Sequence, residues 1–409
     1  MRVTGLRTIG VAVTTALVAA LAGCAAPKPV AVVPLDIVRT QVPAATQAEA
    51  LTRFGESLYN ELLANPNPVY SPVSVFAALG MAYDGAGGDT AAAFQAVLGM
   101  SAAEARATAA YLLTQLTNPG GGTVLTAADS VWLDDTFTAG QDWVNRVAAY
   151  YQAEVYNTDL QAPGTVGAVN DWISKATKGL IPRMLDRIDP LAVALLVNAL
   201  YLKADWAAPF DTADTREGQF TTPAGAQVPA WYMGEDVVVP YIDTPDVQGI
   251  VLPYADGRLA FMAVMPASGD LHLAPGTLQT WLKSATTRGV ILSIPKFHAE
   301  YGPADLSDAL ITLGLGVAFG TQADFSGISP RDVCISRVLH QVTMDVGEKG
   351  TVAAAATTVE LKDLMGSIVD GAVLTFDHPY IYAVMDLTTG VPLFLGAVTD
   401  TSLIPPTAK

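Results

Sequence analysis

The sequence predicts a mixed α+β fold with mainly antiparallel β-sheets. Apolar residues at helix spacing occupy the first part of the chain, from Gln47 to about Leu116, whereas strand patterns dominate after Gln219. The chain lacks the regular alternation of strands and helices that marks parallel βαβ units. Its 409 residues are 51% apolar, which is enough for a substantial core in one large domain or in two or three ordinary ones.

Local patterns justify the elements in chain order. Leu51, Phe54, Leu58 and Leu62 recur at helix spacing, prolines 66 and 68 end that run, and a second helix is expected over 71–81. An Asn-Pro-Gly-Gly-Gly turn at 118–122 separates these helices from the first long strand. Further helices are expected over 141–153, 166–178 and 306–313, and strands over 123–133, 191–203, 237–241, 249–253, 260–266, 289–295 and 338–346.

Composition excludes several classes of function. With 22 Lys and Arg against 39 Asp and Glu, the formal charge of −17 would repel a nucleic-acid backbone. Two cysteines provide no disulfide framework. The four histidines lie far apart without zinc-ligand spacing, and no serine sits in a G-x-S-x-G elbow. We therefore expect no metal, no cofactor and no enzymatic activity.

The N-terminus has the pattern of a secretory signal. Arg2 and Arg7 precede an uncharged run over 8–22, and Leu-Ala-Gly-Cys at 21–24 resembles the bacterial lipobox. The interpretation is a signal peptide over 1–23, lipidation of Cys24, a Pro- and Ala-rich tether over 24–46, and a folded domain over 47–409. The alternatives are an uncleaved anchor helix and ordinary secretory cleavage beside a chance cysteine. Lipidation predicts a bacterial cell-surface protein, secreted and membrane-anchored.

An unusual stretch follows the last predicted strand, with four consecutive alanines at 353–356 between threonines. One interpretation is a helix beginning near Thr351, because alanine is the best helix former. The other is a strand, because every second residue from Thr351 to Leu361 is small or apolar while Glu360 and Lys362 fall on the opposite face.

This stretch resembles the hinge and reactive loop of a serpin, and the likeness extends from about Gln47 to Ser402. The matching motifs occur in the expected order: Ser-Pro-Val-Ser at 71–74, Asn-Ala-Leu-Tyr-Leu-Lys-Ala-Asp-Trp at 198–206, Val-Leu-Pro-Tyr at 251–254, Pro-Lys-Phe at 295–297, Phe-Asp-His-Pro-Tyr at 376–380 and Leu-Phe-Leu-Gly at 393–396. The resemblance implies one α+β domain with a large mixed or antiparallel β-sheet, two smaller sheets, eight or nine helices and an exposed reactive-centre loop over about 348–375.

It also implies an inhibitor of extracellular serine proteases, acting as a monomer and a suicide substrate. The protease cuts the loop, and the loop then inserts as a strand and traps the acyl-enzyme. Small inward residues permit that insertion, which favours an inhibitory member over a non-inhibitory binding or chaperone module. The implied hinge residues are Glu348, Gly350, Thr351, Ala353, Ala354, Ala355, Ala356 and Thr357.

The reactive bond follows from the family's spacing of thirteen residues after the hinge threonine. Counting from Thr351 places the bait at Leu364 and cleavage before Met365, which favours chymotrypsin-like or elastase-like targets. Lys362 is the trypsin-like alternative. Two departures from the family pattern are Val352, where an acidic residue is usual, and a longer stretch between Met365 and residue 376.

The resemblance also assigns residues that control insertion. Ser71, Ser74, Asn198 and His340 match the shutter beneath the sheet, and Trp206 matches the breach where insertion begins. Taken without the resemblance, His340 has the simpler interpretation of a hydrogen-bonded core histidine. A solute-binding surface lipoprotein is the alternative outside the family, and the chain lacks the two repeated α/β lobes that such a protein needs.

Overall fold

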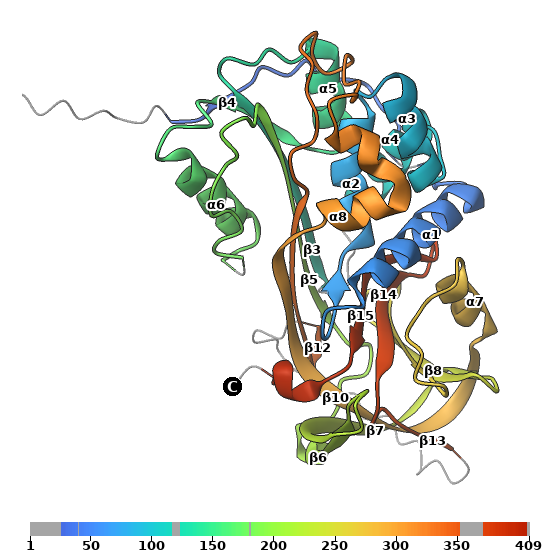
Figure 1. Ribbon diagram of the computed structural model, residues 1–409. Helices are drawn as coiled ribbons and strands as arrows, with labels where there is room; N and C mark the ends of the chain where they lie inside the picture. The colour runs from blue at the N-terminus through green and yellow to red at the C-terminus, as the bar shows by residue number, and fades with distance from the viewer. Residues whose placement is uncertain (1–25, 40, 117–122, 180, 352–370, 407–409) are drawn as a thin grey trace, which may run out of the picture.

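The computed structural model describes residues 26–39, 41–116, 123–179, 181–351 and 371–406. These residues form eight α-helices and fifteen strands. Helices α1 to α5 and α8 gather on one side of the long central strands, whereas α6 stands apart on the other side (Figure 1). The predicted α+β fold with a large mixed sheet is confirmed.

The early helices begin and end at recognisable signals. They are α1 (Ala45–Leu62), α2 (Pro72–Tyr83), α3 (Gly88–Leu98), α4 (Ala102–Leu116) and α5 (Gln141–Tyr150). The Ser71 side chain caps α2 by accepting a hydrogen bond from the Ser74 N–H, and Pro72 occupies the first helical position. Helix α3 ends at Gly99, whose φ of 68° is the left-handed conformation of a helix terminus.

The large sheet has the strand order β4-β3-β5-β12-β11-β10. Only β3 and β4 are parallel; the other neighbours in this order run antiparallel. The bounds are β3 (Val124–Asp134), β4 (Glu154–Thr158), β5 (Ala194–Asp205), β10 (Thr286–Asp305), β11 (Leu339–Gly347) and β12 (Gly350–Thr351). Two-residue β12 therefore lies between the long strands β5 and β11.

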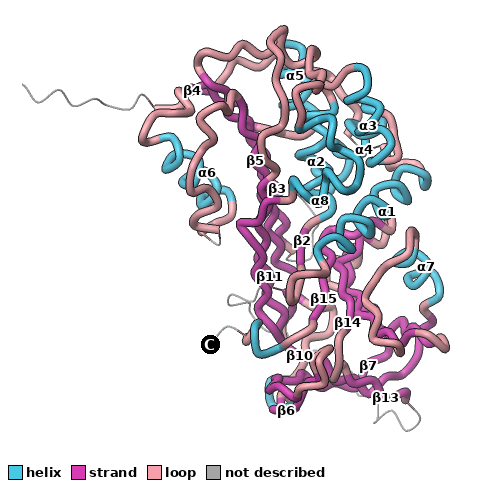
Figure 2. The backbone as a smooth tube through the Cα atoms, viewed as in Figure 1, coloured by secondary structure: helices cyan, strands magenta, loops and turns pink. Residues whose placement is uncertain are grey.

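Strand β10 joins this sheet to the remaining strands. Its first part, up to Lys296, pairs with β7, and its second part, from Phe297, pairs with β11. Figure 2 shows the strands continuing from β11 through β10 to β7. The other strands are β2 (Val69–Tyr70), β6 (Arg216–Thr221), β7 (Gln227–Asp243), β8 (Val247–Pro253), β9 (Leu259–Pro266), β13 (Ala372–Thr375), β14 (Tyr380–Asp386) and β15 (Val391–Val398).

The core lies where the helices meet β14 and β15. Every residue of these two strands is buried. Helix α1 packs Leu51, Phe54 and Leu58 toward the same core, and each of these side chains is at most 2% exposed. Burial of such apolar side chains contributes about 1.5–3 kcal/mol each.

Several elements differ from the sequence-based expectation. The strand expected over 237–241 is the end of β7, which has 17 residues. The helix expected over 306–313 is a short α8 (Ser307–Leu310) followed by a π-turn over Ile311–Leu315. Strand β4 and helix α7 (Thr277–Ser284) were not expected, because both are short and rich in polar residues. Helix α6 (Thr165–Ala176) lies close to its expected range of 166–178.

The N-terminal segment expected to be a tether is bonded to the domain. Its β1 (Lys28–Pro29) pairs with β4, with Lys28 opposite Asn157. Farther along, the Val33 N–H donates to the Asn145 side chain of α5 at 2.9 Å. These contacts hold the segment along the outer edge of the large sheet. Among the helices of the described residues, none is long and apolar enough to cross a membrane.

Candidate functional site

The candidate site is the gap between β5 and β11, where the hinge enters the large sheet. Gly350 pairs with Asp205 of β5 and with Gly347 of β11, and Thr351 pairs with Ala204 and Val346. Gly350 has φ of 144°, and a Cβ there would lie 2.0 Å from the Ala204 carbonyl oxygen. Only glycine fits this approach.

Thr351 points into the core beneath the sheet. Its side chain is fully buried, and its hydroxyl lies 2.5 Å from the Tyr254 hydroxyl. The first hinge residue of the small-residue run is thus in strand conformation with its side chain inward. A charged side chain at this position would lose its hydration, which is costly for folding.

Glu348 is anchored beside the hinge. The Lys296 ammonium and the Thr215 hydroxyl each donate to Glu348 Oε1 at 2.9 Å. Burial opposes ionisation, but hydrogen bonds from its own backbone N–H, Lys296 and Thr215 outweigh it and lower the pKa of Glu348. The carboxylate is therefore charged and fixes the start of the hinge to β10.

Trp206 lies at this end of the gap. Its indole stacks on Tyr254 with ring centroids 4.7 Å apart, and its Nε1–H donates to the Gly347 carbonyl at 2.8 Å. Phe210 and Phe261 approach the indole edge-on. The side chain thus packs under the point where β12 enters the sheet.

A hydrogen-bond network joins the strands on both sides of the gap through the start of α2. The Ser71 N–H donates to His340 Nε2 of β11 at 3.1 Å, and the Ser74 N–H donates to Ser71 Oγ at 3.1 Å. The Ser74 hydroxyl donates to Asn198 Oδ1 of β5. Asn198 Nδ2 in turn donates to Asp129 Oδ1 of β3. We call these five residues the gate network.

Burial controls the charges in the gate network. Desolvation lowers the pKa of His340 to about 4 and raises the pKa of Asp129 to about 7. His340 is therefore neutral near pH 7, and its Nε2 accepts the Ser71 hydrogen bond. Asp129 was not among the residues selected from the sequence. The only signal was an acidic residue within the strand expected over 123–133.

The remaining predicted site residues lie outside the described residues. They comprise the reactive bond, the alternative bait, the alanines, the second hinge threonine and the lipidated cysteine: Leu364, Met365, Lys362, Ala353, Ala354, Ala355, Ala356, Thr357 and Cys24. Their assignments stay predictions. Across the described ranges, no cluster of His, Cys, Asp and Glu is arranged to hold a metal ion.

Comparison with known proteins identifies the family. The model of the family described as "Serpin (serine protease inhibitor)" matches residues 49–401. An uncharacterised serpin-like protein of Thermococcus kodakarensis is 33% identical over 86% of this chain and 85% of its own. A serine protease inhibitor of Rattus norvegicus is 31% identical over 88% of this chain and 90% of its own. The chain therefore belongs to the serpin family.

Solved structures agree with this assignment. The thermophilic serpin tengpin in its native state superimposes with a TM-score of 0.81 at 27% identity, covering 92% of this chain and all of tengpin. Human thyroxine-binding globulin complexed with thyroxine gives a TM-score of 0.78 at 25% identity over 88% of this chain and all of its own. Serpins act as protease inhibitors or non-inhibitory proteins and not as enzymes, so this chain is not an enzyme.

Proposed function

We propose that this serpin inhibits extracellular serine proteases by conformational trapping. The observation that carries the proposal is the position of Gly350 and Thr351, which pair with both β5 and β11 at the head of a run of small residues. The chain is thus aligned to extend β12 between two long strands once its far end is cut.

The chemistry belongs to the target enzyme. The protease serine attacks the carbonyl carbon of the bait residue, Leu364 in this proposal, and the amine of Met365 leaves with a proton from the protease histidine. An ester then joins the protease to Leu364. Insertion of residues 352–364 as a strand carries this ester away from the loop's original position. Trapping requires that insertion be faster than hydrolysis of the ester.

The residues around the gap support such insertion. After insertion, Thr351 and the alternate residues Ala353 and Ala355 would turn small side chains toward the core, which requires no charge to be desolvated. Glu348 and Trp206 fix the starting point. The gate network holds β3, β5 and β11 together until the strands separate.

The test is to mix the protein with chymotrypsin, elastase and trypsin and to search for a covalent complex that survives SDS. Trapping predicts such a complex with chymotrypsin or elastase and a released C-terminal fragment beginning at Met365. A fragment beginning at Asp363 would make Lys362 the bait. Cleavage by all three proteases without any complex would refute inhibition.

A non-inhibitory binding function is the second candidate. Thyroxine-binding globulin, complexed with thyroxine in its solved structure, shares the fold of this chain. Val352 also departs from the acidic residue usual in inhibitory hinges. Complete cleavage without trapping would favour this candidate.

We further propose that Cys24 carries a lipid that anchors the protein to the membrane of a bacterial cell surface. The paired residue Lys28 follows Cys24 closely and lies beside β4, at the end of the molecule that holds α6 (Figure 1). The strands flanking the reactive loop, β12 and β13, lie toward the opposite end. An anchor at Cys24 would thus lie toward the end of the molecule opposite β12 and β13, the strands that precede and follow the reactive loop in the sequence.

A further inference from the structure

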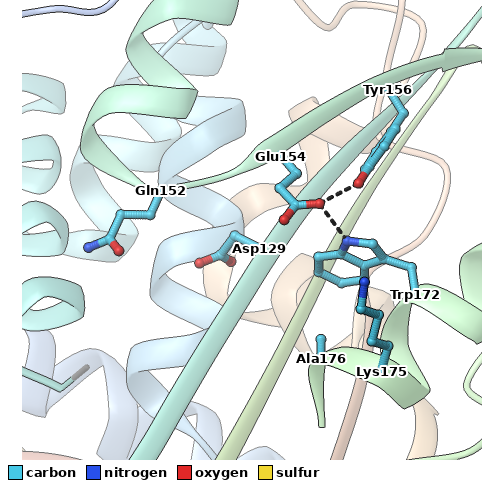
Figure 3. A pocket seen from close by; sticks show the side chains of 7 residues that line it. All are labelled: Asp129, Gln152, Glu154, Tyr156, Trp172, Lys175 and Ala176. Carbon is cyan, nitrogen blue, oxygen red and sulfur yellow. Dashed lines mark hydrogen bonds between the residues drawn. The ribbon is translucent and has the colours of Figure 1, made fainter. Parts of the chain in front are cut away.

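A pocket separate from the gap opens between α6 and the edge of the large sheet (Figure 3). Its volume of about 320 Å³ is close to the lower limit for small-molecule pockets, about 300 Å³. Strands β3 and β4 form one wall and α6 the other. Within the described residues it is lined by Asp129, Gln152, Glu154, Tyr156, Trp172, Lys175 and Ala176.

Glu154 lines this pocket as an exposed residue, and two hydrogen bonds hold its carboxylate. The Trp172 indole N–H donates to Glu154 Oε2 at 2.9 Å, and the Tyr156 hydroxyl donates to the same oxygen. Trp132 stacks on Tyr156 with ring centroids 4.5 Å apart and so fixes the phenol. The second Glu154 oxygen receives no hydrogen bond from the described residues. This oxygen can therefore accept a hydrogen bond without disturbing the two that hold the carboxylate.

Asp129 supplies a second carboxylate, and this one is buried. Its side chain is 3% exposed, and Asn198 donates to Oδ1 while no described residue donates to Oδ2. In the view of Figure 3 the Asp129 carboxylate and Trp172 appear on opposite sides of Glu154, and all three residues line the pocket. A buried carboxylate with one unused oxygen favours a partner that brings both hydrogen-bond donors and positive charge.

The net charge of the lining residues determines which ligand charge the pocket favours. Asp129 and Glu154 carry two negative charges when ionised, and Lys175, exposed at the rim, carries one positive charge. The remaining charge of −1 matches a monovalent cation. The indole of Trp172 and the ring of Tyr156 add apolar surface for methylene groups, and an aromatic face also attracts a cation.

We propose that this pocket binds a small aliphatic primary ammonium ion. The ammonium group would donate to Asp129 Oδ2 and Glu154 Oε1, and the aliphatic chain would lie against Trp172. A free carboxylic acid would meet two carboxylates, and a neutral alcohol would leave both charges unpaired.

A ligand bound in the pocket would also stabilise the gate network. The consequence for strand insertion rests on the proposed inhibitory function. Asp129 accepts from Asn198 of β5, and Asn198 accepts from Ser74 of α2. An ammonium ion paired with Asp129 keeps this carboxylate ionised and its bond to Asn198 intact. The ligand also links α6 to β3 and β4, so it stabilises the closed sheet and slows insertion.

The pH dependence of binding follows from the groups that face Asp129. Glu154 and Tyr156 of β4 and Lys175 of α6 line the same pocket as Asp129, and Tyr151 at the end of α5 interacts with it electrostatically. Burial raises the pKa values of both tyrosines, that of Tyr156 to about 12, so they stay neutral below pH 8. Beyond them lie the charged groups near Tyr151 and the histidine of the gate network: Asp84, Arg106, Arg146 and His340.

The experiment is calorimetric titration of the full chain with n-butylammonium, using butyrate and n-butanol as probes of matched size. We expect n-butylammonium alone to bind, with an affinity about tenfold weaker at pH 6 than at pH 8 because Asp129 is protonated. Glu154→Gln should weaken binding by at least about tenfold. Asp129→Asn should abolish the pH dependence.

The matched control is Glu217→Gln on β6, an exposed acid far from the pocket lining, which should bind as the wild type does. Three results would each refute the proposed ammonium site. They are equal affinity of the wild type and Glu154→Gln for n-butylammonium, tighter binding of butyrate than of n-butylammonium, and no binding of n-butylammonium. The coupling is tested separately, by the fraction of protease trapped with and without n-butylammonium. An unchanged fraction would refute the coupling, whereas failure of trapping with intact calorimetric binding would refute only the inhibitory function.

Discussion

Replacing Asp129 with asparagine should stabilise the protein at neutral and alkaline pH. Burial raises the pKa of this carboxyl from 3.8 to about 7, a difference of roughly three pH units. Each unit corresponds to about 1.36 kcal/mol, so ionised Asp129 costs about 4 kcal/mol of folding free energy above pH 7. Asparagine keeps an oxygen that can accept from Asn198 and carries no charge to desolvate.

The direction in which folding stability changes with pH follows from the number of protons bound in the folded and unfolded states. Between pH 3.8 and about 7 the folded state holds more protons on Asp129 than the unfolded state does, so stability falls as pH rises through this window. His340 has the opposite effect. Its folded pKa is lowered from 6.5 to about 4, so its contribution to stability is complete above pH 6.5 and is lost as pH falls toward 4.

The two groups therefore oppose each other in the wild type between about pH 4 and 6.5, and Asp129→Asn removes one of them. We expect the variant to exceed the wild type by about 4 kcal/mol at pH 8, but by only about 2 kcal/mol at pH 5. The assay is the urea midpoint at both pH values, with Glu217→Gln as the control. A variant no more stable than the wild type at pH 8, or an equal gain at both values, would refute the buried-charge argument.

The remaining predictions test the hinge, the bait, the anchor and the docked N-terminus. Thr351→Arg should convert the inhibitor into a substrate, seen as full cleavage with little SDS-resistant complex; unchanged trapping would contradict the inward position. Leu364→Arg should shift inhibition toward trypsin by more than about tenfold, at least about 1.4 kcal/mol, measured as the ratio of association rates. Cys24→Ser should release the protein from the membrane fraction, and continued membrane association of an uncleaved chain would indicate an anchor helix. Asn145→Ala, which removes the side chain accepting the Val33 N–H, should lower stability by about 1 kcal/mol and speed protease cleavage before residue 40.

Sequence periodicity was sufficient to predict the bounds of an element where the element is long and its burial pattern is regular. The strand expected over 123–133 and the helix over 166–178 lie within a few residues of β3 and α6. It failed where neighbouring chain segments, not local pattern, decide the structure. Strand β4 has the polar sequence Glu-Val-Tyr-Asn-Thr and exists because β3 and β1 pair with its two edges.

The gate network shows a second limit of the sequence. Ser71 and His340 are 269 residues apart, and Ser74 and Asn198 are 124 apart, so no spacing rule brings them together. They were selected through family resemblance alone. The family resemblance did not select Asp129, because its hydrogen bond to Asn198 and the pocket beside it are apparent only in the three-dimensional structure.

A buried acid in the middle of a sheet contradicts the rule that charges stay in water, and such exceptions concentrate at functional sites. Asp129 costs stability when ionised, bonds β3 to β5, and is one of the residues that line the pocket beside α6. Stability alone would favour asparagine here. If insertion requires β3 and β5 to shift relative to α2, an ionisable group at this point weakens the closed sheet near neutral pH and lets a bound cation strengthen it. The more stable Asp129→Asn protein should therefore trap a smaller fraction of protease at pH 8 than the wild type. The substitution stabilises the closed arrangement of the strands that must move during insertion, so activity falls as stability rises.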